Sequence, residues 1–252
     1  MSSRVGVNSS LVVSVVSHGH GKMVRSLLQE IAQASAGVVT RVVLTINIPE
    51  QPVCSFDGEW PFLLELRCNA HPLGFGANHN AALLGATEDF LCVLNPDVGL
   101  QGADPFAALM HAAKDGNEAC AYPIQVDEQG RIQDSERALP TPLALLRRRV
   151  LGQPEARVDW VNAACLMFPR RLWQAVRGFD TSYHMYCEDV DLCLRIRLAG
   201  FTLEKAPCTL LHSGSRASHR KWSHLRWHVG SLLRLWASPA YKAYKKTLYA
   251  RA

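Results

Sequence analysis

The sequence predicts an α/β protein whose sheet is mostly parallel and doubly wound. Over the first half of the chain, short runs rich in β-branched residues alternate with segments of helical spacing. These runs are apolar throughout, which is typical of strands buried on both faces. Hydrophobic residues make up 48% of the 252 residues and charged residues 19%, a composition that excludes a disordered chain. Such sheets bind ligands beyond the carboxyl ends of their strands, so function is expected there.

The predicted elements follow one another along the chain. Strands are expected at residues 11–16, 41–48, 62–67, 90–94, 119–126 and 158–168. Helices are expected at residues 23–34, 77–86 and 103–113, with a short one from Pro169 to Val176. Residues 134–157 carry two prolines and little periodicity, which predicts a long irregular loop with a functional role.

A group of acids precedes the last helix of this region. Glu188, Asp189 and Asp191 stand directly ahead of an apolar run that ends at Gly200. This pattern predicts a helix that begins at the acids, where free N–H groups favour negative charge, and ends at the glycine. On this stretch alone, capping explains the acids as well as catalysis does. Asp191 and Arg195 are four residues apart and are expected to form a supporting ion pair.

Two short motifs at strand ends suit a metal ion. Asn95-Pro96-Asp97 follows the strand predicted at residues 90–94, and its side-chain oxygens suit a hard divalent cation. An ordinary Asn-Pro-Asp turn is the alternative. His212 follows another predicted strand and suits a divalent metal, although a lone histidine is more often structural.

A glycine-containing loop opens the helix predicted at residues 77–86. Gly74 and Gly76 allow close approach of the backbone, and the helix N-terminus could face an anion such as a diphosphate. The loop lacks the third glycine of a dinucleotide fingerprint and does not follow the first strand.

Cysteine usage and hydropathy indicate in which cellular compartment the chain is expected. Eight cysteines without a C-x-x-C pair, mostly inside apolar runs, predict reduced, buried thiols in a cytoplasmic protein and no disulfide or zinc framework. We find no apolar run long enough for a membrane span and no signal peptide.

The C-terminal tail is strongly basic. From Lys205 onwards the chain has 10 Lys and Arg and no acid, whereas residues 1–204 carry 17 basic and 22 acidic residues. Tryptophans and leucines alternate with basic residues at 222–236, which favours a helix on an anionic membrane surface. A helix that packs its apolar side on the domain is an equal alternative, and no nucleic-acid-binding motif is present.

The motifs also occur in a familiar order. A buried first strand is followed by the Asn/Gly-rich loop 69–80, Asn95-Pro96-Asp97, residues 161–168, Gly178-Phe179-Asp180, residues 188–195 and His212. In this order they resemble the inverting family 2 glycosyltransferases of the GT-A fold, especially the bacterial rhamnosyltransferase-like branch. The resemblance implies a GT-A domain at residues 1–215 and a basic amphipathic helical extension at residues 216–252.

The resemblance assigns roles to individual residues. Asp97 and His212 would bind Mg²⁺ or Mn²⁺ bridging the donor diphosphate, with Asn95 in place of the first aspartate of the family motif. Asp189 would be the catalytic base, with Glu188 as second choice. Donor contacts are implied for Ser17, His18, Asn47, Gly74, Gly76, Asn78, Asn80 and Asn95, and acceptor contacts for Trp160, Asn162 and Ala163. Relatives usually carry an aspartate where Asn47 stands, and Asn47 could still hydrogen-bond a pyrimidine edge.

The implied reaction is inverting transfer of a sugar from a nucleotide-diphosphate donor to a hydroxyl of a bacterial surface glycan or lipid-linked oligosaccharide. L-rhamnose from dTDP-rhamnose is one implied donor sugar and a UDP-hexose is another. One metal ion to stabilise the leaving group and one carboxylate base suffice for this chemistry. The expected location is the cytoplasm, peripheral on the inner face of the membrane.

Two other classes stay open at this point. One is a catalytically silent subunit that binds a nucleotide sugar. The other is a different nucleotide-dependent enzyme. A dehydrogenase is disfavoured by the missing Gly-x-Gly-x-x-Gly after the first strand, and a nucleotidyltransferase would release pyrophosphate.

Overall fold

The computed structural model describes residues 9–50, 59–101, 104–114, 118–151, 157–213 and 222–250. Cys54, the start of the helix predicted at residues 103–113 and the first residues of the basic tail, 216–221, lie outside the described residues.

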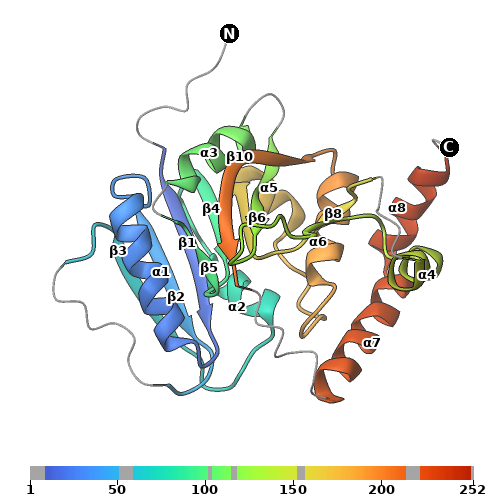
Figure 1. The fold of residues 1–252 in the computed structure, drawn as a ribbon, viewed down its shortest axis with the longest axis horizontal. Helices are drawn as coiled ribbons and strands as arrows, with labels where there is room; N and C mark the ends of the chain where they lie inside the picture. The colour runs from blue at the N-terminus through green and yellow to red at the C-terminus, as the bar shows by residue number, and fades with distance from the viewer. Residues whose placement is uncertain are drawn as a thin grey trace, which may run out of the picture.

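Within the described chain, one eight-stranded sheet forms the centre of the molecule, in the order β3-β2-β1-β4-β9-β6-β10-β5 (Figure 1). Its strands are β1 (Leu11–Ser17), β2 (Arg41–Ile46), β3 (Leu63–Cys68), β4 (Phe90–Leu94), β5 (Val98–Gly99), β6 (Ala119–Val126), β9 (Cys165–Pro169) and β10 (Thr202–His212). Only β9 and β5 run against the others. The prediction of a mostly parallel α/β sheet is therefore confirmed.

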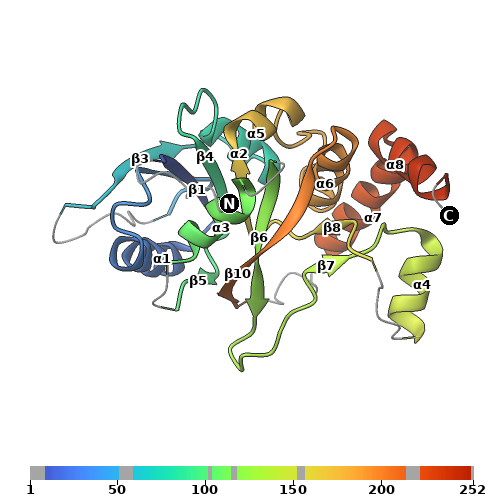
Figure 2. The ribbon, with the colours of Figure 1, turned by 90° about the horizontal axis from the view of Figure 1, so that it is seen from above.

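Helices cover both faces of this sheet. They are α1 (Gly21–Ala34) and α3 (Pro105–Lys114) on one face, and α2 (Phe75–Ala82), α5 (Arg170–Val176) and α6 (Glu188–Leu198) on the other. At one end of the molecule, Figure 2 shows three further helices: α4 (Pro142–Leu151), α7 (Trp222–Ala237) and α8 (Pro239–Tyr249). A short second sheet pairs β7 (Glu136–Arg137) with β8 (Trp160–Val161).

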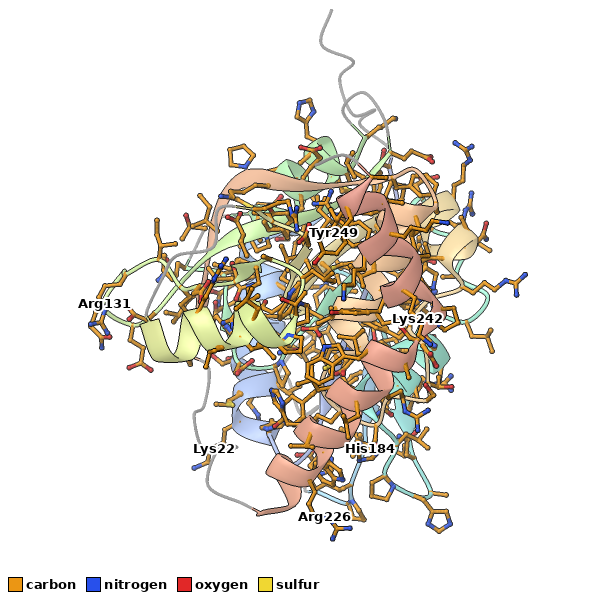
Figure 3. The ribbon with its side chains drawn as sticks, turned by 90° about the vertical axis from the view of Figure 1, so that its right-hand side faces the viewer. Lys22, Arg131, His184, Arg226, Lys242 and Tyr249 are labelled. Carbon is orange, nitrogen blue, oxygen red and sulfur yellow. The ribbon has the colours of Figure 1, made fainter. Side chains whose placement is uncertain are left out.

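The basic tail packs on the domain. Leu235, Tyr241 and Tyr244 of α7 and α8 are buried in a cluster with Val190 and Leu194 of α6. The two tail helices meet at Ser238, whose Oγ accepts a hydrogen bond from Tyr241 N (3.1 Å) and so begins α8. Figure 3 shows both helices crossing one side of the molecule. The tail helices therefore pack their apolar side on the domain. The domain boundary between residues 215 and 216 stays a prediction.

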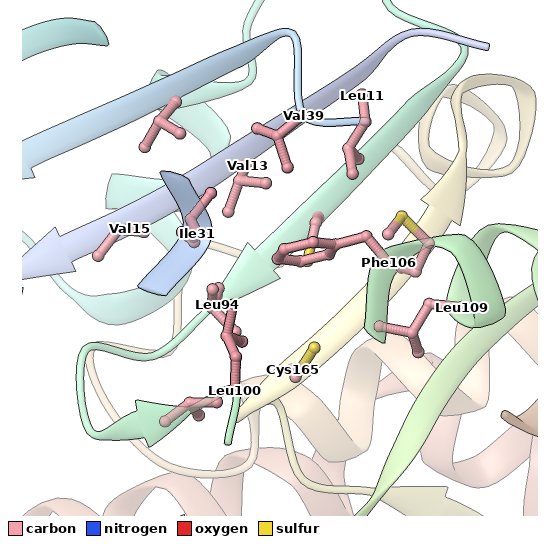
Figure 4. Close-up of a cluster of buried hydrophobic side chains, with 14 of the residues drawn as sticks. Leu11, Val13, Val15, Ile31, Val39, Leu94, Leu100, Phe106, Leu109 and Cys165 are labelled. Carbon is pink, nitrogen blue, oxygen red and sulfur yellow. The ribbon is translucent and has the colours of Figure 1, made fainter. Parts of the chain in front are cut away.

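The core explains why the first strands are apolar along their whole length. Leu11, Val13 and Val15 of β1 point to one face, where they meet Ile31 of α1 and Phe106 of α3 (Figure 4). Val12, between them in the chain, packs with the helices of the opposite face. Since successive side chains of a strand point to opposite faces, burial of both faces requires a continuous apolar run. None of the described helices combines the length and apolarity needed to cross a bilayer.

The irregular loop predicted at residues 134–157 is wrong in part. This region contains β7 and the helix α4. Thr141 Oγ1 accepts a hydrogen bond from Ala144 N (3.0 Å), and Pro142 occupies the first turn of the helix. The proline that indicates a loop thus stands at the one helical position where it is favourable.

The single strand predicted at residues 158–168 is also wrong. It is two strands in two sheets, β8 and β9, separated by a turn at 162–164. Asn162 Oδ1 accepts hydrogen bonds from Ala164 N (3.3 Å) and Gln125 Nε2 (2.6 Å). A polar side chain that bonds its own backbone two residues on makes a turn inside an otherwise apolar run.

Candidate active site

A cavity of about 480 Å³ opens at the carboxyl ends of β1, β2 and β4. It is the kind of position at which open α/β sheets bind their ligands. Five predicted donor and metal residues line it: His18, Asn47, Asn78, Asn95 and Asp97. The remaining wall comes largely from α7 and three other segments, through the residues Pro72, Leu73, Phe75, His79, His184, Met185 and Trp227.

Asp97 and His212 are brought together although 115 positions of the numbering separate them. β5, next to Asp97, pairs with the end of β10, so Val98 lies opposite His212. Asp97 Oδ2 lies 3.6 Å from His212 Nε2. The other oxygen of Asp97, Oδ1, is buried with no hydrogen-bond partner among the described residues.

Gln133 orients the ring of His212. The amide of Gln133 donates from Nε2 to the carbonyl oxygen of His212 (2.5 Å), which places its Oε1 3.1 Å from His212 Nδ1. An oxygen can only accept, so Nδ1 donates its N–H to Gln133. Nε2 is the ring nitrogen that faces the Asp97 carboxylate.

Carboxylate oxygens and an imidazole nitrogen are ligands that divalent ions take in proteins, and Oδ1 of Asp97 has no partner among the described residues. The geometry of Asp97 and His212 fits an ion such as Mg²⁺ or Mn²⁺. Within the part of the chain that the structure describes, no group of three or more His, Cys, Asp or Glu side chains is arranged to hold a metal. The protein would supply two ligands, and a bound ligand or water would supply the others.

We expect Gln133→Leu to lower the affinity for Mn²⁺ by about 10–100-fold, because an outer partner that orients a metal-binding histidine is lost. Calorimetric titration of Mn²⁺ in the presence of dTDP measures this. Gln129→Leu makes the same chemical change at an exposed position and should leave the affinity unchanged. Equal affinity in both variants would contradict the role of Gln133.

Asn47 forms hydrogen bonds to two loops beside the cavity, the one that contains His18 and the one at residues 69–74. Its Nδ2 donates to His18 Nδ1 (2.9 Å) and Leu73 O (3.0 Å), and its Oδ1 accepts from Leu73 N and Asn69 Nδ2 (both 2.8 Å). Asn78 continues the network by accepting from Asn69 Nδ2 (2.6 Å). All the hydrogen-bonding capacity of the Asn47 amide is used within the protein, so Asn47 positions His18 and the loop at residues 69–74.

The remaining predicted donor residues contact protein segments. A Cβ on Gly74 would lie 2.5 Å from His184 O, and one on Gly76 would lie 2.5 Å from Phe179 Cβ. The glycines thus let α2 approach the segment 179–184. Asn80 exchanges two hydrogen bonds with the backbone of Phe179 (2.8 and 2.9 Å) and does not line the cavity.

Ser17 ends β1 next to the cavity. Its Oγ accepts from His20 N (3.2 Å), and its carbonyl accepts from Asn47 N (2.8 Å). The donor contacts expected of Ser17, Gly74, Gly76 and Asn80 stay predictions.

The acids predicted to be catalytic stand at the start of α6. Asp189 is half-buried, and its Oδ1 accepts from Val190 N (2.8 Å), as expected of an acid at a helix N-terminus. Burial raises the pKa of the Asp189 carboxyl to about 6. Burial and the neighbouring charge of Asp189 raise the pKa of Glu188 to about 8. Glu188 Oε2 is buried without a hydrogen-bond partner in the described chain.

The third acid has a structural role. Asp191 Oδ2 accepts from Arg195 Nε at 2.6 Å, which confirms the predicted ion pair. Arg195 also donates to the carbonyls of Val176 and Gly178, so it joins α6 to the end of α5. The predicted end of the helix is also confirmed, since Gly200 has φ +89° directly after α6.

We expect Glu188→Gln to raise the melting temperature at neutral and alkaline pH. The pKa of Glu188 lies above its ordinary value of 4.5, so ionisation is disfavoured in the folded state. Ionisation of Glu188 therefore lowers the free energy of unfolding. This effect is absent below pH 4.5, grows as pH rises and is complete above about pH 8. Melting curves from pH 4 to 9 should show a gain that grows with pH. A gain that is the same at every pH would contradict the assignment.

Some predicted residues lie away from this cavity. Glu188 and Asp189 do not line it, although Met185, a few residues earlier, does. The predicted acceptor residues do not line it either. Trp160 Nε1 donates to Ala138 O (2.9 Å), the Asn162 amide is paired with Gln125, and Ala163 is buried. Their acceptor role stays a prediction.

The structure adds site residues that the sequence analysis did not single out. His79 lines the cavity one helical turn after Phe75, and its Nδ1 lies 2.8 Å from Ser14 Oγ. Burial lowers the pKa of His79 to about 3, so its ring is neutral at pH 7. Trp227 and Gln133 do not belong to a motif of the site, because the residues that each contacts there are distant in the sequence.

The chain is similar to known proteins in sequence and in fold, although no protein-family model matches it. Over 254 residues the chain is 26% identical to the rhamnosyltransferase WbbL of Escherichia coli K12, covering 88% of this chain and 90% of the relative. The chain is similar in sequence to bacterial rhamnosyltransferases. A second relative, the N-acetylglucosaminyl-diphospho-decaprenol L-rhamnosyltransferase of Mycobacterium tuberculosis, is 31% identical over 188 residues, with 62% of this chain and 61% of the relative covered.

Solved structures show the same fold. The mannosyltransferase PcManGT of Pyrobaculum calidifontis, in complex with GDP-Man and Mn²⁺, has a TM-score of 0.60 at 16% identity, covering 96% of this chain and 75% of its own. TarS of S. aureus has a TM-score of 0.52 at 15% identity, covering 82% and 35%. The fold is that of the GT-A glycosyltransferases. The resemblance to the rhamnosyltransferase-like branch is confirmed.

Proposed function

We propose that the chain is a metal-dependent inverting glycosyltransferase that transfers L-rhamnose from dTDP-rhamnose to a hydroxyl of a lipid-linked saccharide of the bacterial cell surface. The observation that carries the proposal is the pair of Asp97, which lines the cavity and has an unpartnered carboxylate oxygen, and His212, whose Nε2 lies 3.6 Å from the same carboxylate. The relatives named rhamnosyltransferases support the sugar, and one of their names supports an acceptor carried on a lipid diphosphate.

The donor would span the cavity. His18 and Asn47, at the ends of β1 and β2, lie on the side where the nucleoside would bind, and Asp97 lies where its diphosphate would end. Bound Mg²⁺ or Mn²⁺ would act as a Lewis acid that stabilises charge on the leaving diphosphate. Asp97 and His212 would hold this ion, and Asn95 would contribute a polar wall beside it.

Asp189 would remove the proton from the attacking hydroxyl. With a pKa of about 6 it is ionised at neutral pH, yet more basic than an ordinary aspartate, as a general base requires. Its hydrogen bond from Val190 N holds the carboxylate in one orientation. Glu188 retains its proton at pH 7 and therefore does not compete for this role. Attack from the side opposite the leaving group inverts the anomeric centre.

A thermal-shift panel of nucleotide sugars, each with and without Mn²⁺ or Mg²⁺, tests the proposal. A ligand that binds only the folded state raises the melting temperature. We expect dTDP-rhamnose with metal to stabilise the protein more than either component alone and more than UDP-glucose with metal. No shift of the melting temperature with any nucleotide sugar would contradict the proposed function. A larger shift with a UDP-hexose than with dTDP-rhamnose would indicate that the donor is a UDP-hexose.

We further propose that the tail helices hold the protein on the anionic inner surface of the membrane, where a lipid-linked acceptor resides. Arg226, Arg234, Lys242 and Lys246 are exposed on α7 and α8, and Figure 3 shows Arg226 and Lys242 on the outer side of these helices. Exposed Leu233 adds an apolar contact on the same surface. Basic helices of this kind bind anionic lipid.

We expect the triple change Arg226→Glu, Arg234→Glu and Lys242→Glu to lower partitioning onto phosphatidylglycerol vesicles by on the order of 100-fold, since each basic residue near the surface contributes about 1 kcal/mol. These side chains lie outside the core, so the fold should persist, whereas deletion of α7 would remove the buried Leu235.

The matched control for the tail carries the same charge reversal at Lys22, Arg25 and Lys114, which are exposed on α1 and α3. It should partition like the unmodified protein. An equal loss in both triple variants would indicate that net charge alone, and not the tail surface, attracts the vesicle.

A further inference from the structure

We propose that Trp227 of α7, together with His184, forms the subsite that receives the sugar ring of the acceptor. This inference rests on the proposed function and names a residue that faces the second substrate. The predicted acceptor residues Trp160, Asn162 and Ala163 lie away from the cavity, whereas Trp227 lines it.

The lining of the cavity contains two chemically different groups of residues. Residues from the ends of β1 and β2 form a polar group, with the asparagine network around Asn47. His184, Met185 and Trp227 form an aromatic and apolar group. In Figure 1, β2 lies at the left of the sheet, and α7 lies to the right of the sheet. A donor nucleotide on the polar group would leave the aromatic group for the other substrate.

Trp227 presents an aromatic surface for a sugar ring. Its side chain is 38% exposed, a large value for tryptophan in a folded domain. Its ring lies 5.1 Å from the ring of His184 at an angle of 57°, so the two rings form adjoining walls. Pyranose rings carry a face of C–H groups and a rim of hydroxyls. Such a face suits a flat apolar surface, and the imidazole can hydrogen-bond the rim.

The subsite is held in place before any ligand binds. Ser231 Oγ, one helical turn after Trp227, donates to Met185 O (2.8 Å). The rings of Tyr186 and His228 lie 5.2 Å apart. One face of α7 thus fixes the backbone of residues 184–186. Preorganised contacts of this kind reduce the ordering cost of binding.

The same short segment leads directly to the proposed base. Tyr186 and Cys187 both have left-handed backbones, with φ of 71° and 66°, and turn the chain into α6, where Asp189 stands. Non-glycine residues in this conformation persist only where surrounding structure holds them. A sugar ring on Trp227 would therefore lie beside residues 184–187, which lead directly to Asp189. The same segment would position both the acceptor hydroxyl and the Asp189 carboxylate.

Saturation-transfer NMR on the full chain, with dTDP and Mg²⁺ present, tests this subsite. The probes are the octyl glycosides of N-acetylglucosamine, glucose and rhamnose. We expect the unmodified protein to saturate the ring protons of at least one probe. Trp227→Ala should weaken that binding by about tenfold, and Trp227→Phe should retain most of it, because a flat aromatic face remains. Both variants should bind dTDP with unchanged affinity.

Val229→Ala is the matched control, because Val229 is 49% exposed on the same helix and does not line the cavity. It should behave like the unmodified protein. Binding of all three glycosides that persists in Trp227→Ala, or that is absent from the unmodified protein, would overturn the subsite. A parallel loss of dTDP affinity in Trp227→Ala would also overturn it and place the indole in the nucleotide site. If the unmodified protein fails to bind dTDP, the proposed function itself is contradicted.

Discussion

Asp189→Asn is expected to lower the rate of sugar transfer by about 10²–10⁴-fold, the range that a positioned general base contributes. Asparagine has nearly the same shape but cannot take the proton of the attacking hydroxyl at neutral pH. The donor and metal should still bind with unchanged affinity, because Asp189 does not line the cavity beside Asp97. Initial rates with dTDP-rhamnose and a lipid-linked N-acetylglucosamine acceptor measure the effect.

The pH profile gives an independent readout of the same residue. Since the pKa of Asp189 is raised to about 6, its base form is lost as pH falls through this value. The rate should therefore fall roughly tenfold for each pH unit below about 6. Glu188→Gln is the matched variant and should retain transfer, because Glu188 is already protonated at pH 7. Full activity of Asp189→Asn would contradict the role of Asp189 as the base. An inactive Glu188→Gln would indicate that Glu188 is the base instead.

Asp97→Ala is expected to abolish the coupling between metal and donor. In the unmodified protein, Mn²⁺ should tighten binding of dTDP by at least about 10–100-fold, comparable to the effect of a partner that only orients a metal ligand. Without the carboxylate, one protein ligand remains, and dTDP affinity should be the same with and without Mn²⁺. Calorimetric titration of dTDP at several Mn²⁺ concentrations measures this.

The control for Asp97 is Glu128→Ala, which removes one negative charge from an exposed turn. It should leave the metal dependence intact. His212→Ala should reproduce most of the effect of Asp97→Ala, because His212 Nε2 faces the same carboxylate. An unchanged metal titration in Asp97→Ala would contradict the metal site.

Much of the fold could be predicted from the sequence because local pattern and burial agree. β4 and β6 have the predicted bounds, since each is a mostly apolar run ended by turn residues. The prediction failed where one residue changes the path of the chain. Asn162 turns an apolar run into two strands, and Thr141 with Pro142 starts a helix where prolines indicate a loop.

The candidate site was predictable where a motif stands at a strand end. Asp97 and His212 were predicted separately, and the pairing of β5 with β10 brings them together. Residues that act through distant partners were not predictable. Gln133 contacts His212 across 79 positions and Trp227 reaches the cavity from the tail. The full use of the Asn47 amide also required the structure, because its partners Asn69 and Leu73 lie in another loop.

The anomeric configuration of the product tests the central claim most directly. The unmodified protein is incubated with dTDP-rhamnose, Mn²⁺ and the lipid-linked acceptor, and the new glycosidic linkage is examined by NMR while the released nucleotide is identified. We predict release of dTDP and a rhamnoside whose anomeric configuration is opposite to that of the donor. Retention of configuration, or release of pyrophosphate, would contradict a single displacement assisted by Asp189 and a metal at Asp97.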